Sequence, residues 1–169
     1  MTQPWPRRIS AVCFDWGGTL MSEAGPADLP MCDWPQVAAI DGALQTLRAL
    51  HGRHLVCVAT NAAQSRTPQV ERALERVGLL RYVSRVFCSA ELGVRKESPA
   101  FWSAVAASLG VTPGDLAMVG DNLEPDVLSP GRCGVFSVWF NEGGRKPQPP
   151  GVRMVTRLQD FARLVAAQG

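Results

Sequence analysis

The sequence lacks any long run of apolar residues. Its longest apolar stretches are five to seven residues and lie beside charges or glycines, whereas a membrane helix needs about twenty. The start, MTQPWPRRIS, carries two arginines, but Asp15 interrupts the apolar run that begins at Ile9, so the pattern of a signal peptide is missing. We therefore expect neither a signal peptide nor a membrane partner.

A surplus of one sign of charge is also absent. Seventeen basic and fifteen acidic residues leave a formal net charge of +2, and the arginines are scattered among the acids. No basic stripe of the kind that binds nucleic acid stands out, so we expect no nucleic-acid partner. Lysine is scarce in this arginine-rich chain, where only Lys96 and Lys146 occur.

The five cysteines form no CxxC pair, and their number is odd. Three of them, Cys13, Cys57 and Cys88, lie in short apolar runs where cysteine serves as a small hydrophobic residue. This pattern predicts reduced cysteines and a cytoplasmic protein. With 169 residues, of which 46% are hydrophobic and 19% charged, the chain has the length and composition of a single domain over residues 1–169.

Short apolar runs alternate with segments of helical period along the whole chain. The runs predict buried strands at 9–14, 55–59, 85–89, 116–119, 135–140 and 153–156. Apolar residues at helical spacing predict helices around 37–47, 70–77, 101–109 and 157–166. Thr67 and Ser98, each followed by proline, are expected N-caps. Right-handed crossovers then give an α/β fold, a doubly wound parallel sheet in three layers.

Polar residues follow the predicted strands, where doubly wound sheets bind their ligands. The first strand ends in FDWGGTL at 14–20, the second in Thr60 and Asn61, and the fourth in VGDNLEPDV at 119–127. Lys96 precedes the helix that follows the third strand. Two acids, a hydroxyl and an amine are therefore expected at one edge of the sheet.

This ordered set resembles the four motifs of the haloacid dehalogenase-like (HAD) hydrolase superfamily, mostly magnesium-dependent phosphatases and phosphotransferases. The resemblance covers residues 9 to about 140. It implies a Rossmann-like HAD core, a phosphorylated substrate, Mg²⁺ as cofactor and Asp15 as the nucleophile that forms an aspartyl-phosphate. By the same resemblance, Thr60 and Lys96 are catalytic and bind the phosphoryl group together with Asn61.

The implied metal ligands are Asp15, the Gly17 carbonyl and Asp121, a set of oxygen atoms that suits magnesium. Asp126 would lie behind them and orient metal-bound water or the Lys96 ammonium. Thr60 is also expected to shape the turn that follows it. Trp16 either lines the substrate site or packs beneath the loop.

Gly17 departs from the family pattern, because phosphatases of this superfamily carry there a second aspartate that acts as general acid and base. Its absence removes a contribution of about 10²–10⁴ in rate and puts efficient hydrolysis of alkyl phosphates in doubt. Residues 21–35 are predicted to form a loop that could act as a flap or minimal cap over the site. Our hypothesis is that one acid of this loop, Glu23, Asp28 or Asp33, replaces the missing second aspartate. The segment 141–151, rich in proline and glycine, is a second predicted loop.

Related chemistries fit less well. Phosphonoacetaldehyde hydrolases resemble this sequence around Asp15, but their Schiff-base lysine comes from a helical cap, and no lysine occurs between Met1 and Arg95. Haloacid dehalogenases place tyrosine where Gly17 stands.

The chief alternative is a module that binds Mg²⁺ and a phosphorylated ligand or protein with little turnover. An open site without a large cap favours a bulky or macromolecular substrate; the sequence predicts no oligomeric state.

Overall fold

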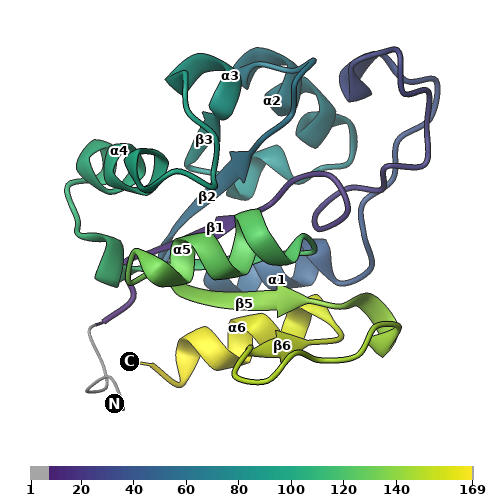
Figure 1. Ribbon diagram of the computed structural model, residues 1–169. Helices are drawn as coiled ribbons and strands as arrows, with labels where there is room; N and C mark the ends of the chain where they lie inside the picture. Colours follow the sequence, from purple (N-terminus) through teal and green to yellow (C-terminus); the bar gives the residue numbers. More distant parts are fainter. Residues whose placement is uncertain (1–7, 169) are drawn as a thin grey trace.

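The computed structural model describes residues 8–168. The expectation that the start of the sequence is not a signal peptide concerns residues 1–7 and lies outside this range. Within this range six parallel strands form one sheet in the order β3-β2-β1-β4-β5-β6 (Figure 1). Their bounds are β1 (Ala11–Phe14), β2 (Leu55–Thr60), β3 (Arg85–Cys88), β4 (Leu116–Gly120), β5 (Phe136–Phe140) and β6 (Met154–Val155). Each strand end lies within two residues of its predicted position, which confirms the predicted sheet.

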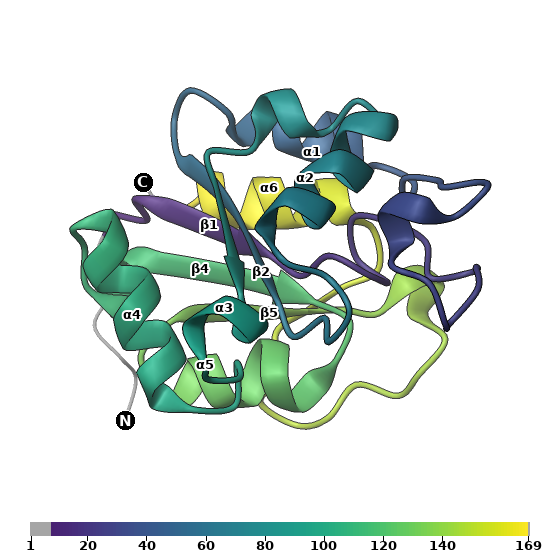
Figure 2. The same cartoon turned by 90° about the horizontal axis from the view of Figure 1, so that it is seen from above.

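Helices cover both faces of the sheet, as the doubly wound prediction requires (Figure 2). One core packs under α1, α2 and α6, and a separate core packs under α4 on the other face, where α3 and α5 also lie. The bounds are α1 (Ala43–Leu50), α2 (Thr67–Arg76), α3 (Ser89–Leu92), α4 (Pro99–Leu109), α5 (Ser129–Arg132) and α6 (Leu158–Ala166). No helix among the described residues is long and apolar enough to cross a membrane.

The prediction of a helix from Val37 was wrong at its start. Residues 38–40 pair instead with residues 20–22, through an antiparallel bridge between Met21 and Ala39 and hydrogen bonds on either side of it. Gly42 then takes a φ of 81° and α1 begins at Ala43. The apolar residues at 37 and 40 thus belong to an extended segment, because tertiary pairing outweighs helical periodicity.

The two expected N-caps have different outcomes. Ser98 caps α4 as predicted, accepting a hydrogen bond from the Ala100 N–H at 3.3 Å. Thr67 is instead the first residue of α2, and its hydroxyl donates to Glu91 at 2.6 Å. A carboxylate on a neighbouring element thus uses the hydroxyl that the sequence pattern assigned to the cap.

Residues 21–35, the expected flap, contain a short 3-10 turn over Met31–Asp33 and lie against α2. The Arg76 guanidinium donates to the carbonyls of Cys32 and Trp34 at 3.1 and 2.7 Å. Asp33 forms an ion pair with Arg72 at 3.0 Å. The segment is therefore fixed to the helix that follows β2, beside the carboxyl edge of the sheet.

Candidate active site

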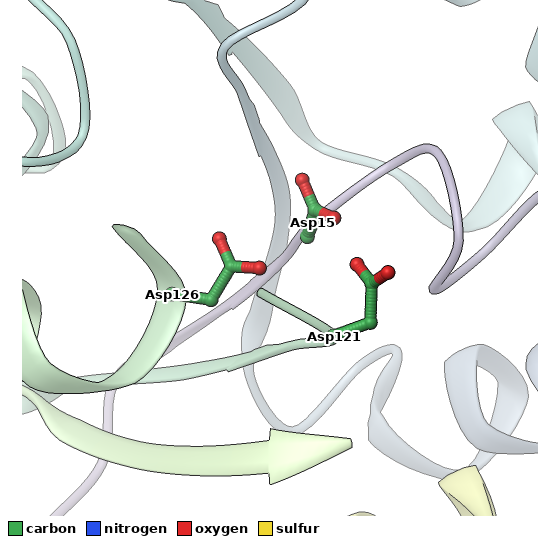
Figure 3. Close-up of side chains that lie close together, drawn as sticks. All are labelled: Asp15, Asp121 and Asp126. Atoms are coloured by element: carbon green, nitrogen blue, oxygen red, sulfur yellow. The ribbon is translucent and has the colours of Figure 1, made fainter. Parts of the chain in front are cut away.

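The order of strands reverses between β1 and β4, and Asp15 follows β1 at this point. Its N–H donates to the Val119 carbonyl of β4 at 2.9 Å, and the residue is 6% exposed. Asp121 and Asp126 follow β4, and one carboxylate oxygen of each of the three aspartates lies within 4.8 Å of the others (Figure 3). The chain thus brings three acids together at the position where open α/β sheets bind ligands.

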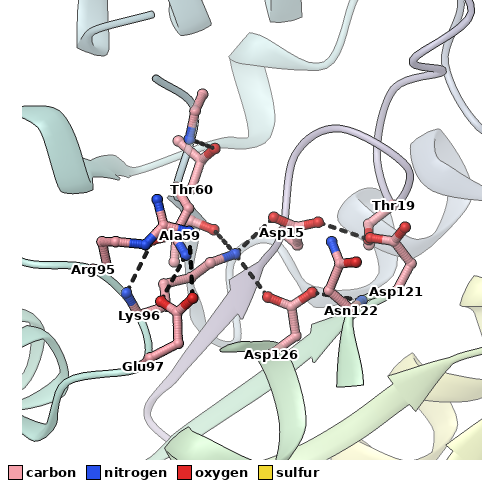
Figure 4. Close-up of polar contacts among 12 residues, drawn as sticks. Asp15, Thr19, Ala59, Thr60, Arg95, Lys96, Glu97, Asp121, Asn122 and Asp126 are labelled. Atoms are coloured by element: carbon pink, nitrogen blue, oxygen red, sulfur yellow. Dashed lines mark hydrogen bonds and ion pairs between the residues drawn. The ribbon is translucent and has the colours of Figure 1, made fainter. Parts of the chain in front are cut away.

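Lys96 is 2% exposed and supplies positive charge to this cluster. Its Nζ donates to Asp15 and to Asp126, each at 2.7 Å, and to the Ala59 carbonyl at 3.0 Å (Figure 4). Burial opposes the charge on Lys96, but the two carboxylates outweigh burial and raise the pKa of Lys96. The ammonium therefore stays protonated and fixes the orientation of the Asp15 carboxylate.

The chain holds Lys96 by its backbone on both sides. The Trp102 indole N–H donates to the Lys96 carbonyl at 2.8 Å, and the Lys96 N–H donates to the Asn61 side-chain oxygen at 2.9 Å. The Asn61 amide nitrogen in turn donates to Glu97 at 2.9 Å. The Asn61 side chain, expected to contact the phosphoryl group, thus organises the loop that carries Lys96.

The remaining two aspartates resist ionisation in the absence of a cation. Burial raises the pKa of Asp121 to about 8, with a further increase from the hydrogen bond and charge of Asp15. Burial, followed by the charge of Asp15, raises the pKa of Asp126 to about 6, although Lys96 opposes this shift. A divalent cation would remove this mutual repulsion, and clustered carboxylate oxygens are the ligands that Mg²⁺ prefers. The donor set therefore fits the predicted metal.

Two glycines make room for the acids. A Cβ on Gly120 would collide with the Asp126 carboxylate, which also accepts a hydrogen bond from the Asn122 N–H at 2.9 Å. A Cβ on Gly18, whose φ is 80°, would collide with the Asp121 carboxylate. Asp126 lies in a π-helical turn over Glu124–Leu128, a type of irregularity often found at functional sites.

Sequence reasoning assigned no role to Thr19. This fully buried residue donates through its hydroxyl toward Asp15 at 3.4 Å and Asp121 at 3.3 Å. It bridges the two aspartates on the side of Asp15 away from Lys96 (Figure 4). Its position four residues after Asp15, in an otherwise apolar turn, is the only sequence signal for this contact.

Thr60 and Trp16 both lie buried where their strands end. The Thr60 oxygen accepts a hydrogen bond from the Ala62 N–H at 3.0 Å, so the residue shapes the turn and retains a hydroxyl proton to donate. Trp16 is 3% exposed, and its indole N–H donates to the Met21 sulfur at 3.1 Å. Its ring therefore packs beneath the loop, which favours the second of the two expectations for Trp16.

Comparisons with solved structures place this arrangement on a known fold. An uncharacterised protein from Listeria monocytogenes serotype 4b superposes with a TM-score of 0.80 at 22% identity, over 94% of this chain and 98% of that one. A HAD phosphatase from Thermococcus onnurineus superposes with a TM-score of 0.73 at 18% identity, over 94% and 99%. At these identities the likeness shows a shared fold.

Sequence comparisons show the family. A phosphoserine phosphatase of Thermus thermophilus is 33% identical over 102 residues, 60% of this chain and 41% of that protein. A pyrimidine 5′-nucleotidase of Escherichia coli is 32% identical over 130 residues, 75% of this chain and 56% of that protein, so the chain spans about half the length of these relatives. The family model for haloacid dehalogenase-like hydrolases matches residues 33–134. The chain belongs to the haloacid dehalogenase-like hydrolases.

Proposed function

We propose that this protein is a magnesium-dependent phosphohydrolase or phosphotransferase that acts on phosphate monoesters through Asp15. The observation that carries the proposal is the buried carboxylate of Asp15, held by Lys96 at 2.7 Å and flanked by Asp121 and Asp126. The family match begins at residue 33, so the role of Asp15 depends on this geometry. The phosphatase names of the relatives described above support the same class of substrate.

A carboxylate that attacks a phosphate monoester approaches a group that is already anionic. Bound Mg²⁺, held by Asp15, Asp121 and the Gly17 carbonyl, would neutralise charge on the phosphoryl oxygens. Lys96 supplies a second, permanent positive charge, and the Thr60 hydroxyl donates to a phosphoryl oxygen. Asp126 positions Lys96 between itself and Asp15, since both carboxylates accept from the same ammonium.

The reaction divides into two displacements. An Asp15 oxygen forms a bond to phosphorus while the bond from phosphorus to the leaving oxygen breaks, and that oxygen takes the electron pair. Water, or another hydroxyl in a phosphotransferase, then attacks the phosphorus of the aspartyl-phosphate and releases the Asp15 carboxylate. Splitting one difficult displacement into two easier ones is the usual advantage of a covalent intermediate.

A second candidate function is binding of Mg²⁺ and a phosphorylated ligand or protein with little turnover. Gly17 favours it, because a glycine cannot protonate a leaving group. The buried ion pair of Lys96 and Asp15 favours the enzyme, since this pair aligns a nucleophilic oxygen that binding alone does not require.

We further propose a cytoplasmic protein that takes bulky or macromolecular phosphorylated substrates, because the 21–35 segment is short.

Release of p-nitrophenolate from p-nitrophenyl phosphate tests the proposal, because this leaving group needs no proton. We expect Mg²⁺-dependent turnover by the wild type, loss of at least about 10³-fold in Asp15→Asn, and no change in Asp28→Asn, which alters an exposed acid of the flap segment. Acid quench of the wild type should trap phosphate on Asp15. Absence of turnover in the wild type, with Mg²⁺ and phosphate still raising its melting temperature, would favour the binding module.

A further inference from the structure

The two glycines after Trp16 are each covered by a carboxylate from another part of the chain. A Cβ on Gly18 would collide with Asp121, and a Cβ on Gly17 would collide with the Glu23 Oε1 atom. Gly17 does not have the positive φ of Gly18, so its backbone does not require glycine. The missing side chain at Gly17 instead leaves the space that the Glu23 carboxylate fills.

Glu23 reaches the site from the flap segment. Although the residue lies on the surface, its carboxylate folds back onto the backbone two residues after Asp15. Glu23 is therefore a fourth acid at this edge of the sheet, outside the group of three that could hold a metal.

The backbone around Glu23 is held in place. The Ser22 N–H donates to the Ala38 carbonyl, and the Gly25 N–H to the Glu23 carbonyl, both at 2.9 Å. Gly25 lies so close to the Trp34 ring that a Cβ there would collide with it. Because Arg76 fixes Trp34 to α2, the turn that carries Glu23 is anchored to the body of the protein.

The other acids near the site have different partners. Asp126 is bonded to Lys96, and Asp121 belongs to the carboxylate group that could hold a metal. Asp33 forms its ion pair with Arg72, and Asp28 is exposed in the same segment. Of the three acids that the sequence offered as replacements for the missing aspartate, the structure brings Glu23 against Gly17.

We propose that Glu23 is the general acid and base of the phosphoryl transfer at Asp15, an inference that rests on the proposed function. As the bond between phosphorus and the leaving oxygen breaks, the Glu23 carboxyl group gives its proton to that oxygen and becomes a carboxylate. The carboxylate then takes a proton from the water that attacks the aspartyl-phosphate. The products are an alcohol and inorganic phosphate, and both Glu23 and Asp15 return to their starting states.

The test compares single-turnover and steady-state kinetics of the wild type and Glu23→Gln on aryl and alkyl phosphates. On alkyl phosphates such as phosphoserine, we expect the first turnover of Glu23→Gln to slow by about 10²-fold, because the leaving alkoxide needs a proton. On p-nitrophenyl phosphate we expect a burst of p-nitrophenolate equal to the enzyme concentration, followed by slow turnover. The burst arises because the second step lacks its base, so phosphate accumulates on Asp15.

Two further variants separate a catalytic role from a structural one. Asp28→Asn, the matched acid of the same segment, should behave as the wild type on both substrates. Glu23→Ala combined with Gly17→Asp places a carboxylate in the vacated space, and should recover at least about 10-fold of the alkyl phosphate rate lost in Glu23→Ala alone. Both outcomes are measured on variants whose melting temperatures match that of the wild type.

The proposal is overturned if Glu23→Gln slows the first turnover of aryl and alkyl phosphates equally, or slows neither. It is also overturned if the wild type turns over p-nitrophenyl phosphate but no alkyl phosphate. Either result, with turnover of p-nitrophenyl phosphate that depends on Asp15, leaves the proposed function intact. If the wild type releases no p-nitrophenolate, the proposed function and the role of Glu23 fail together.

Discussion

At the scale of single residues, the Lys96 ammonium compensates two buried carboxylates at once. Replacing it in Lys96→Met leaves Asp15 and Asp126 buried without their partner, and breaking a buried ion pair in this way costs about 3–5 kcal/mol. Urea unfolding in metal-free buffer should show this loss. The control is Lys146→Met, which removes the exposed second lysine and should change stability by less than about 0.5 kcal/mol. Equal effects of the two variants would contradict the pairing.

Lys96 stabilises the metal-free protein, whereas the Asp121 carboxyl destabilises it as the pH rises. The reason is that the pKa of Asp121 in the folded protein is raised to about 8. Between about pH 4 and pH 8 the folded protein keeps a proton that the unfolded chain has lost, so stability falls as pH rises through this window. We therefore expect the free energy of unfolding of metal-free Asp121→Asn, relative to that of the wild type, to rise by about 1–2 kcal/mol as the pH goes from 5 to 8. The expected change is this small because the Asp121 carboxyl is only partly buried. Unfolding curves that keep a constant difference across this range would refute the shift.

At the scale of elements, Arg76 on α2 holds the 21–35 segment through backbone carbonyls. Arg76→Met leaves these acceptors without their donor, and we expect a loss of about 1–3 kcal/mol. Hydrogen exchange should rise in residues 22–35, while β1 and β4 remain protected. Arg48→Met, on the exposed face of α1, is the matched control. If exchange in the segment stays at the wild-type rate, the anchor lies elsewhere.

The four inner strands, β2, β1, β4 and β5, could be predicted closely because each is a short apolar run with most of its residues buried, and burial alone explains such a run. The start of α1 could not, because residues 38–40 pair with residues 20–22, a contact between segments that periodicity does not encode. The same limit applies to Thr67, whose hydroxyl contacts Glu91 on α3. Local patterns thus failed where a neighbouring element supplied a stronger partner.

At the scale of the whole molecule, the site was predictable to the extent that its residues follow strands. Parallel strands end at one edge, so the positions of Asp15, Thr60 and Asp121 at strand ends implied their meeting. Lys96 lies in the loop between α3 and α4, and the resemblance to the HAD motifs implied its place beside them. Contacts made within loops were not implied in this way. Thr19 and Glu23 approach the site through the turn after β1 and the segment beyond it, and no periodicity fixes where such side chains point.

The carboxylate cluster also joins the two halves of the sheet, since Asp15 follows β1 and Asp121 follows β4. A cation that binds only the folded protein stabilises it by about 2.7 kcal/mol at one hundred times its dissociation constant. We expect Mg²⁺ to raise the melting temperature of the wild type but not of Asp121→Asn.

Because β1 and β4 are adjacent and buried, this stabilisation should appear as slower hydrogen exchange in both central strands. Binding of Mg²⁺ to scattered surface acids would give a different pattern, with equal stabilisation of the wild type and Asp121→Asn and no added protection of β1. The two measurements together therefore decide whether the acids form a site that links the halves of the fold.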